Sequence, residues 1–92
     1  MHYFYVLYSL KDHRLYKGTT SDVGSRFIRH NSGGNKSTAH RKPFVLIYAE
    51  QYESKKEALE AERHYKSLKG GAMLKSMLID KGILKGDGAL NG

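Results

Sequence analysis

The sequence predicts one small domain that combines β-strands with α-helices. With 92 residues, the chain is long enough for one hydrophobic core and too short for two cores that hold together unaided. Runs of aromatic and β-branched residues alternate with segments of helical periodicity. Only 39% of the residues are hydrophobic, but seven tyrosines and three phenylalanines supply bulky side chains for a compact core.

The amino-terminal part predicts a β-hairpin. Residues 3–9 are aromatic and β-branched, residues 11–14 are polar as in a turn, and residues 15–20 return to strand-like composition. Because side chains alternate along a strand, Tyr3 and Tyr5 share one face. The hairpin therefore places tyrosines on a common surface.

A short helix and a loop follow the hairpin. Ser21 or Asp22 can cap the helix, which reaches about residue 30. Residues 31–34, Asn-Ser-Gly-Gly, tolerate the left-handed backbone that ends a helix. Residues 33–43 are rich in Gly, Ser, Lys and Arg and predict an exposed basic loop.

The second half predicts one strand and two helices. Residues 44–49 are continuously apolar, as in a buried strand. Ser54 and Glu57 form a capping box for an amphipathic helix that we expect to end at Gly70-Gly71. Residues 73–78 indicate a further short helix.

The domain is expected to span residues 1–85, because the last seven residues are rich in glycine and offer few apolar side chains. Residues 86–92 are therefore expected to form a frayed, flexible tail.

Composition narrows the range of functions. The chain has no cysteine, which excludes disulfides, zinc–thiolate sites and thiol nucleophiles, and favours a reducing compartment such as the cytoplasm. No segment approaches the roughly 18 apolar residues that cross a bilayer, and the amino terminus lacks a signal-peptide layout, so we expect neither membrane insertion nor export. A formal charge of +7 favours a nucleic-acid partner, although solubility alone also explains basic charge.

Three groups of residues could carry chemistry. Helical spacing from Ala58 and Tyr65 places Glu62 on the apolar stripe, where a carboxylate needs a cation. The alternative is an ordinary i,i+4 ion pair between Glu62 and Lys66.

The histidines show no metal-ligand spacing, and the sequence has neither a P-loop nor a Ser-His-Asp arrangement, so other hydrolase classes are unsupported.

The other two groups are a cationic pair and a tyrosine pair. Arg26 and His30 are spaced i,i+4, so that both can reach one anionic oxygen unless they are simply surface residues. Tyr5 and Tyr16 can orient a nucleophilic water, and a phenol could take a proton if neighbouring cations lowered its pKa. Core packing is the alternative role for both tyrosines.

These features together resemble the GIY-YIG nuclease family, in which two tyrosine motifs on adjacent strands precede a helix with Arg and His and a later helix with a metal-binding Glu. Tyr3-Phe4-Tyr5 stands at the first motif and Tyr16-Lys17-Gly18 at the second. The similarity covers about residues 2–69 and is closest to small standalone members related to the amino-terminal nuclease module of the bacterial excision-repair nuclease. The departures are Tyr3 for a glycine, Phe4 and Lys17 for isoleucines, and Thr19 or Thr20 where some repair members carry a lysine.

The resemblance implies an α/β (α+β) fold with a central antiparallel sheet of about three strands flanked by helices. It also implies a metal-dependent endonuclease that hydrolyses DNA phosphodiester bonds, in repair or recombination. Glu62 would hold one Mg²⁺ or Mn²⁺ ion, and Arg26 would hold the scissile phosphate. Tyr5 and Tyr16 would position or deprotonate water with His30 relaying the proton, and which tyrosine acts as the base stays open.

The expected partner is DNA, with RNA left open, and a partner protein or a homodimer would supply specificity. The expected contacts are basic residues of the second strand and of the loop before the third, namely Lys17, Lys36, His40, Arg41 and Lys42. The alternative function is a catalytically inactive nucleic-acid-binding module with the same fold.

Overall fold

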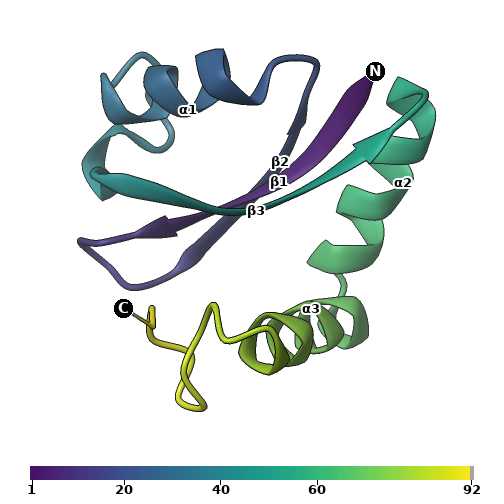
Figure 1. The fold of residues 1–92 in the computed structure, drawn as a ribbon. Coiled ribbons are helices and arrows are strands. Elements are labelled where there is room, and N and C mark those ends of the chain that lie inside the picture. Colours follow the sequence, from purple (N-terminus) through teal and green to yellow (C-terminus); the bar gives the residue numbers. More distant parts are fainter. Residues whose placement is uncertain (92) are drawn as a thin grey trace.

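A computed structural model describes residues 1–91 of the chain (Figure 1). The elements in order are β1 (His2–Ser9), β2 (Leu15–Thr20), α1 (Val23–Asn31), the short 3-10 helix η1 (Ala39–Arg41), β3 (Phe44–Tyr52), α2 (Lys55–Lys66) and α3 (Leu68–Asp80). The strands form one antiparallel sheet in the order β2-β1-β3. The predicted α+β class is confirmed, and β3 continues three residues beyond the predicted end of that strand.

The central strand β1 divides the core into two layers. Phe4, Val6 and Tyr8 point to one face and pack with Leu74 and Leu78 of α3. The alternate residues of β1 point to the other face, where Tyr5 and Leu7 pack with residues of β2, β3 and α1. In Figure 1, α1 accordingly lies on one side of the sheet, and α2 and α3 lie on the other.

The ends of α1 are fixed by side chains. Of the two predicted caps, Asp22 is the one used, because its carboxylate accepts from the backbone N–H of Ser25. At the other end, the Asn31 amide donates to the carbonyl of Phe44 and accepts from its N–H, at 3.0 and 2.6 Å. These two bonds tie the end of α1 to the start of β3.

The boundary between α2 and α3 differs from the prediction. Ser54 caps α2 as expected, but the helix ends at Lys66, and α3 begins at Leu68 instead of near residue 73. Gly70 lies inside α3, where an added Cβ would overlap the backbone carbonyl of His64. This glycine therefore permits close packing of two helices, whereas the sequence pattern suggested a break.

The carboxy-terminal segment, expected to form a flexible tail, makes contacts with the residues before it. Residues 86–91 turn back, so that Leu84 and Leu90 form a β-bridge and the Asn91 N–H donates to the Ile83 carbonyl at 3.0 Å. Leu84 is buried in the core, with Leu90 packed against it. Gly92, the last residue of the expected tail, lies outside the described residues.

Within residues 1–91, no helix is long and apolar enough to cross a membrane.

Candidate active site

The centre of the candidate site is a hydrogen bond between Tyr5 of β1 and His30 of α1. The phenol oxygen of Tyr5 lies 3.0 Å from Nε2 of His30, and both side chains are at most 1% exposed. Gly18 faces Tyr5 across the β1–β2 pair, and a Cβ at this position would lie 2.7 Å from the phenol oxygen. Only glycine leaves room for Tyr5 here, which gives the glycine of the second tyrosine motif a steric role.

Thr38 sets the proton positions on His30. The Thr38 hydroxyl lies 2.9 Å from Nδ1 of His30 and donates to the carbonyl of Asn35 at 3.4 Å. With the hydroxyl proton directed at the Asn35 carbonyl, we assign the imidazole proton to Nδ1, which leaves Nε2 as the acceptor for the Tyr5 O–H. Thr38 is 2% exposed. Thr38 is not among the site residues predicted from the sequence, because a threonine in a Gly- and Ser-rich loop carries no sign of burial.

Tyr16 of β2 completes the aromatic part of the site. Its ring centroid lies 4.7 Å from that of His30 and 6.2 Å from that of Tyr5. Unlike Tyr5, it is only partly buried. The two tyrosines thus contact the same imidazole, and Tyr16 is the one with access to solvent.

Burial is the largest influence on the pKa of both Tyr5 and His30, and the neighbouring charges oppose it only at Tyr5. Burial raises the pKa of Tyr5 well above its usual value, the Tyr16 phenol raises it further, and the Arg26 guanidinium opposes both. A lowered pKa, the condition under which a phenol could take a proton, is therefore not met at Tyr5, since burial outweighs the opposing effect of Arg26. Burial also lowers the pKa of His30, with Arg26 and then Arg29 acting in the same direction. A neutral His30 fits its role as hydrogen-bond acceptor.

Glu62 lies on α2, on the other side of the sheet from α1. Its carboxylate forms an ion pair with Lys66 at 2.8 Å, and its side chain is 20% exposed. The i,i+4 pair that the sequence left as the alternative is therefore present. Among the described residues, no hydrogen bond or ion pair joins Glu62 to Tyr5 or His30.

Two of the five predicted nucleic-acid contacts have partners within the fold. The Lys17 ammonium is part-buried and donates to the Tyr65 carbonyl at the end of α2, at 2.9 Å. Arg41 forms an ion pair with Asp12 at 2.6 Å and donates to the Leu15 carbonyl at 3.2 Å. These bonds explain why the pKa of Asp12 falls to about 2, mainly through the Arg41 bond. Lys36, His40 and Lys42 are exposed, as predicted.

Comparison with known protein families agrees with this arrangement. The model of the GIY-YIG catalytic domain matches residues 1–74, most of the chain. The chain therefore belongs to the GIY-YIG family, which confirms the resemblance seen in the sequence and implies a nuclease type of function. Members of this family are generally endonucleases, and generally use divalent metal ions.

Several relatives share most of their length with this chain. A UPF0213 protein of Bacillus velezensis is 46% identical over 68 residues, covering 73% of this chain and 68% of the relative. A UPF0213 protein of Staphylococcus saprophyticus is 40% identical over 82 residues, covering 88% and 96%. The solution NMR structure of a UPF0213 protein from Bacillus halodurans matches with a TM-score of 0.51 and 39% identity, covering 83% of each chain.

Proposed function

We propose that this protein is a metal-dependent endonuclease that hydrolyses DNA phosphodiester bonds, with a role in repair or recombination. The observation that carries the proposal is the chain of hydrogen bonds from Tyr5 through His30 to Thr38. A buried phenol that donates to a neutral, oriented imidazole is a means of moving a proton. It lies beside Arg26, a permanent cation suited to a phosphate.

The chain of hydrogen bonds gives each group a role in activating water. The attacking water transfers a proton to the Tyr5 oxygen while the Tyr5 proton passes to Nε2 of His30. No free phenolate accumulates, which suits a phenol whose pKa is raised by burial. Tyr16, the more exposed of the two phenols, orients the water. The Thr38 hydroxyl oxygen accepts a hydrogen bond from the Nδ1–H of His30 throughout and keeps the imidazole oriented.

Arg26 holds the phosphate whose bond is cut. It follows Asp22 by one helical turn on α1 and lies close enough to affect the pKa of both Tyr5 and His30. A guanidinium in this place offsets the negative charge that grows on the phosphate oxygens in the transition state. Arg29 lies three residues further along the same helix and is exposed.

Glu62 would hold the metal ion. Its part-exposed carboxylate supplies one hard oxygen donor, which fits a Mg²⁺ or Mn²⁺ ion that keeps most of its waters. Within residues 1–91 there is no cluster of three or more possible metal ligands, so a site here relies on water and substrate oxygens. When bound, the ion supplies positive charge to the phosphate and the leaving oxygen. Lys66 must then give up its contact with Glu62.

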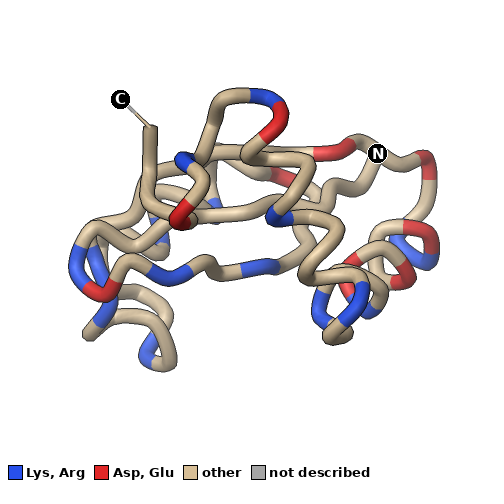
Figure 2. The backbone as a smooth tube through the Cα atoms, turned by 90° about the horizontal axis from the view of Figure 1, so that it is seen from below, with Lys and Arg blue, Asp and Glu red and all other residues tan. Residues whose placement is uncertain are grey.

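The surface that would follow the DNA backbone consists of α1 and the loop after it. Residues 23–49 contain no Asp or Glu, and the exposed Arg29, Lys36, His40 and Lys42 lie in this stretch. In Figure 2, by contrast, the helix on the right, α2, shows acidic and basic residues mixed. Backbone contacts of this kind give affinity without sequence specificity, so a partner protein or a homodimer would supply the rest.

The proposal is tested by cleavage of labelled single-stranded, duplex and branched DNA with Mg²⁺ or Mn²⁺. Glu62→Gln and added chelator should each abolish cleavage, while DNA binding persists. Glu60→Gln, an exposed carboxylate of the same helix, serves as the matched control and should cut like wild type. Cleavage that survives both Glu62→Gln and chelator would refute the proposal.

A second candidate function is a nucleic-acid-binding module without catalysis. The observation that favours it is the ion pair of Glu62 with Lys66, which occupies the carboxylate expected to hold the metal. In that case the wild type binds DNA in a salt-sensitive manner and cuts none of the three substrates. Glu62→Gln then binds DNA with the same affinity as the wild type.

A further inference from the structure

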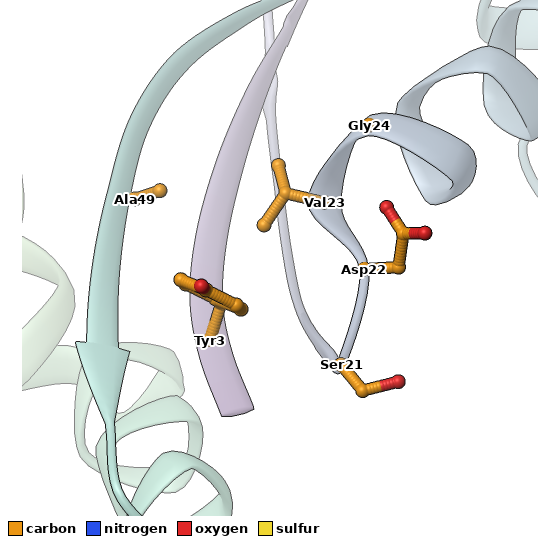
Figure 3. A pocket seen from close by; sticks show the side chains of 6 residues that line it. All are labelled: Tyr3, Ser21, Asp22, Val23, Gly24 and Ala49. Carbon is orange, nitrogen blue, oxygen red and sulfur yellow. The ribbon is translucent and has the colours of Figure 1, made fainter. Parts of the chain in front are cut away.

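A pocket opens beside the candidate active site on the α1 face of the sheet (Figure 3). Its volume is about 400 Å³, and its walls come from β1, β3 and the start of α1. The side chains of Tyr3, Val23 and Ala49 form its apolar walls, and the chain from Ser21 to Gly24 closes one side. This size lies within the range of roughly 300–1,000 Å³ typical of small-molecule sites.

The pocket is continuous with the site through shared residues. Tyr3 and Tyr5 lie two positions apart on one face of β1, about 7 Å along the strand. Ala49 pairs directly with Tyr5 across the β1–β3 ladder. Val23 lines the pocket and also packs against the cluster that contains Tyr5. Arg26 follows Val23 by three positions, so it lies on the same side of α1.

The chemistry of the pocket favours a flat, uncharged group over a phosphate. The Tyr3 ring offers an aromatic surface opposite the aliphatic Val23. Asp22 caps the start of α1, and bonds from Ser25, chiefly its backbone N–H, lower the pKa of that carboxylate. A negative charge there repels anions, although helix starts otherwise attract them. In a protein that acts on DNA, the flat and uncharged group is a base.

We propose that this pocket binds a nucleobase that adjoins the phosphate held by Arg26, with the Tyr3 ring as its stacking surface. The place of the phosphate and the choice of a nucleobase as occupant rest on the proposed function, whereas the pocket and its lining do not. The Tyr3 ring stands where the family motif has a glycine, so the stacking surface is a departure from that motif. A base can enter only when it is unstacked from its neighbours, so the nucleotide beside the cut must be unpaired or extruded.

The proposal is tested first by binding without cleavage. DNA oligonucleotides carrying 2-aminopurine at successive positions are mixed with wild type in chelator, and fluorescence is followed. Stacking on Tyr3 should quench the probe at one position. Tyr3→Phe should retain the quenching, whereas Tyr3→Ala should lose it and bind about tenfold more weakly. Gln51→Ala is the matched control, because Gln51 is exposed and pairs with Tyr3 in the sheet outside the pocket.

A second variant tests the pocket independently, in case Tyr3→Ala does not fold. Ala49→Phe fills the pocket while leaving Tyr3 in place, and should lose the quenching equally. Its fold, and that of Tyr3→Ala, is checked by the dispersion of amide signals in NMR spectra. Quenching that persists in folded Ala49→Phe, or that is absent from wild type at all positions, would overturn the pocket.

Cleavage of oligonucleotides with a single abasic site, scanned past the cut, separates this proposal from the nuclease proposal. One abasic position should slow wild type about tenfold and leave Tyr3→Ala unchanged. If DNA is cut but no abasic position matters, the pocket is wrong and the nuclease function stands. If DNA is never cut but the quenching depends on Tyr3, the pocket stands and the nuclease function fails.

Discussion

The two faces of the sheet each carry a group of tyrosines, and the groups differ in their partners. On the α1 face, Tyr5 bonds to His30 beside Arg26. On the α2 and α3 face, three phenols donate to one carboxylate of β3, Glu50. The donors are Tyr48 at 2.5 Å, Tyr52 at 2.6 Å and Tyr65 at 3.3 Å.

Burial raises the phenol pKa on both faces, so burial alone does not distinguish a site from a core. At Tyr48 and Tyr52 the bonds to Glu50 and its negative charge raise the pKa further. At Tyr5 the charge of Arg26 acts in the opposite direction. The phenols around Glu50 form a closed network whose donors are all used. The phenols around His30 lie beside Arg26, a permanent positive charge, which is a property that a phosphate site requires.

The largest expected effect is that of Arg26→Ala on cleavage. Loss of the guanidinium removes charge stabilisation from the transition state, so the rate should fall about 100-fold or more. Arg29→Ala, an exposed arginine of the same helix, is the matched control and should cost only a few-fold. The rates are measured in single-turnover assays. Equal losses in the two variants would mean that the α1 face supplies only general positive charge.

Glu50→Ala should instead destabilise the fold. Three phenols lose their shared acceptor, so the free energy of unfolding should fall by roughly 1–3 kcal/mol. Urea denaturation measures the loss, and Glu53→Ala, an exposed carboxylate near the end of β3, is the control. Cleavage per folded molecule should stay at the wild-type level well below the melting temperature. Loss of cleavage with intact stability would assign Glu50 a catalytic role instead of a structural one.

Thr38→Val is expected to slow cleavage about tenfold by freeing the His30 ring to change tautomer. Thr38→Ser keeps the hydroxyl and should restore most of the rate. NMR of the His30 ring nitrogens reports the tautomer directly, without any need for activity. If Thr38→Val kept the His30 proton on Nδ1 and still cleaved more slowly, Thr38 would not act through the tautomer of His30.

The sequence predicted contacts between residues that are close along the chain, and the faces that follow from the period of a helix or strand. The spacing of Arg26 and His30, the faces of β1 and the cap at Ser54 all follow from such repeats, and the family resemblance joined Tyr5 to His30. It did not predict partners that are distant along the chain. Lys17 is among the expected nucleic-acid contacts, and nothing in the sequence indicated its acceptor, the Tyr65 carbonyl, which lies 48 residues away.

Other features that the sequence did not predict have the same physical origin. Gly70 was taken as a helix break, since its role as a close-packing residue depends on the neighbouring turn of α2. Arg41 belongs to a basic loop in the sequence, yet Asp12 of the hairpin turn engages it in space. The burial of Thr38 depends on how the loop folds over α1, which no repeat in the sequence records.

The pKa of His30 gives a prediction for pH. Because that pKa is lowered from 6.5, His30 stays neutral in the folded state at pH values where the unfolded chain is protonated. The unfolded state then binds more protons, so the free energy of unfolding should fall as pH decreases below about 6.5. His30→Gln should remove this part of the decrease between pH 7 and pH 5, while exposed His40→Gln should not. Parallel curves for the three proteins would contradict the lowered pKa.

The smallest effect separates exposed lysines from the one used by the fold. Lys42→Ala should reduce the dependence of DNA affinity on salt by about one unit of log–log slope, because one phosphate contact is lost. Lys17→Met should leave that slope unchanged and lower the melting temperature, since the Lys17 ammonium binds the end of α2. Titrations at several salt concentrations measure the slope. A reduced slope for Lys17→Met would show that this ammonium leaves the Tyr65 carbonyl to contact DNA, and the α2 side of the sheet would then belong to the interface.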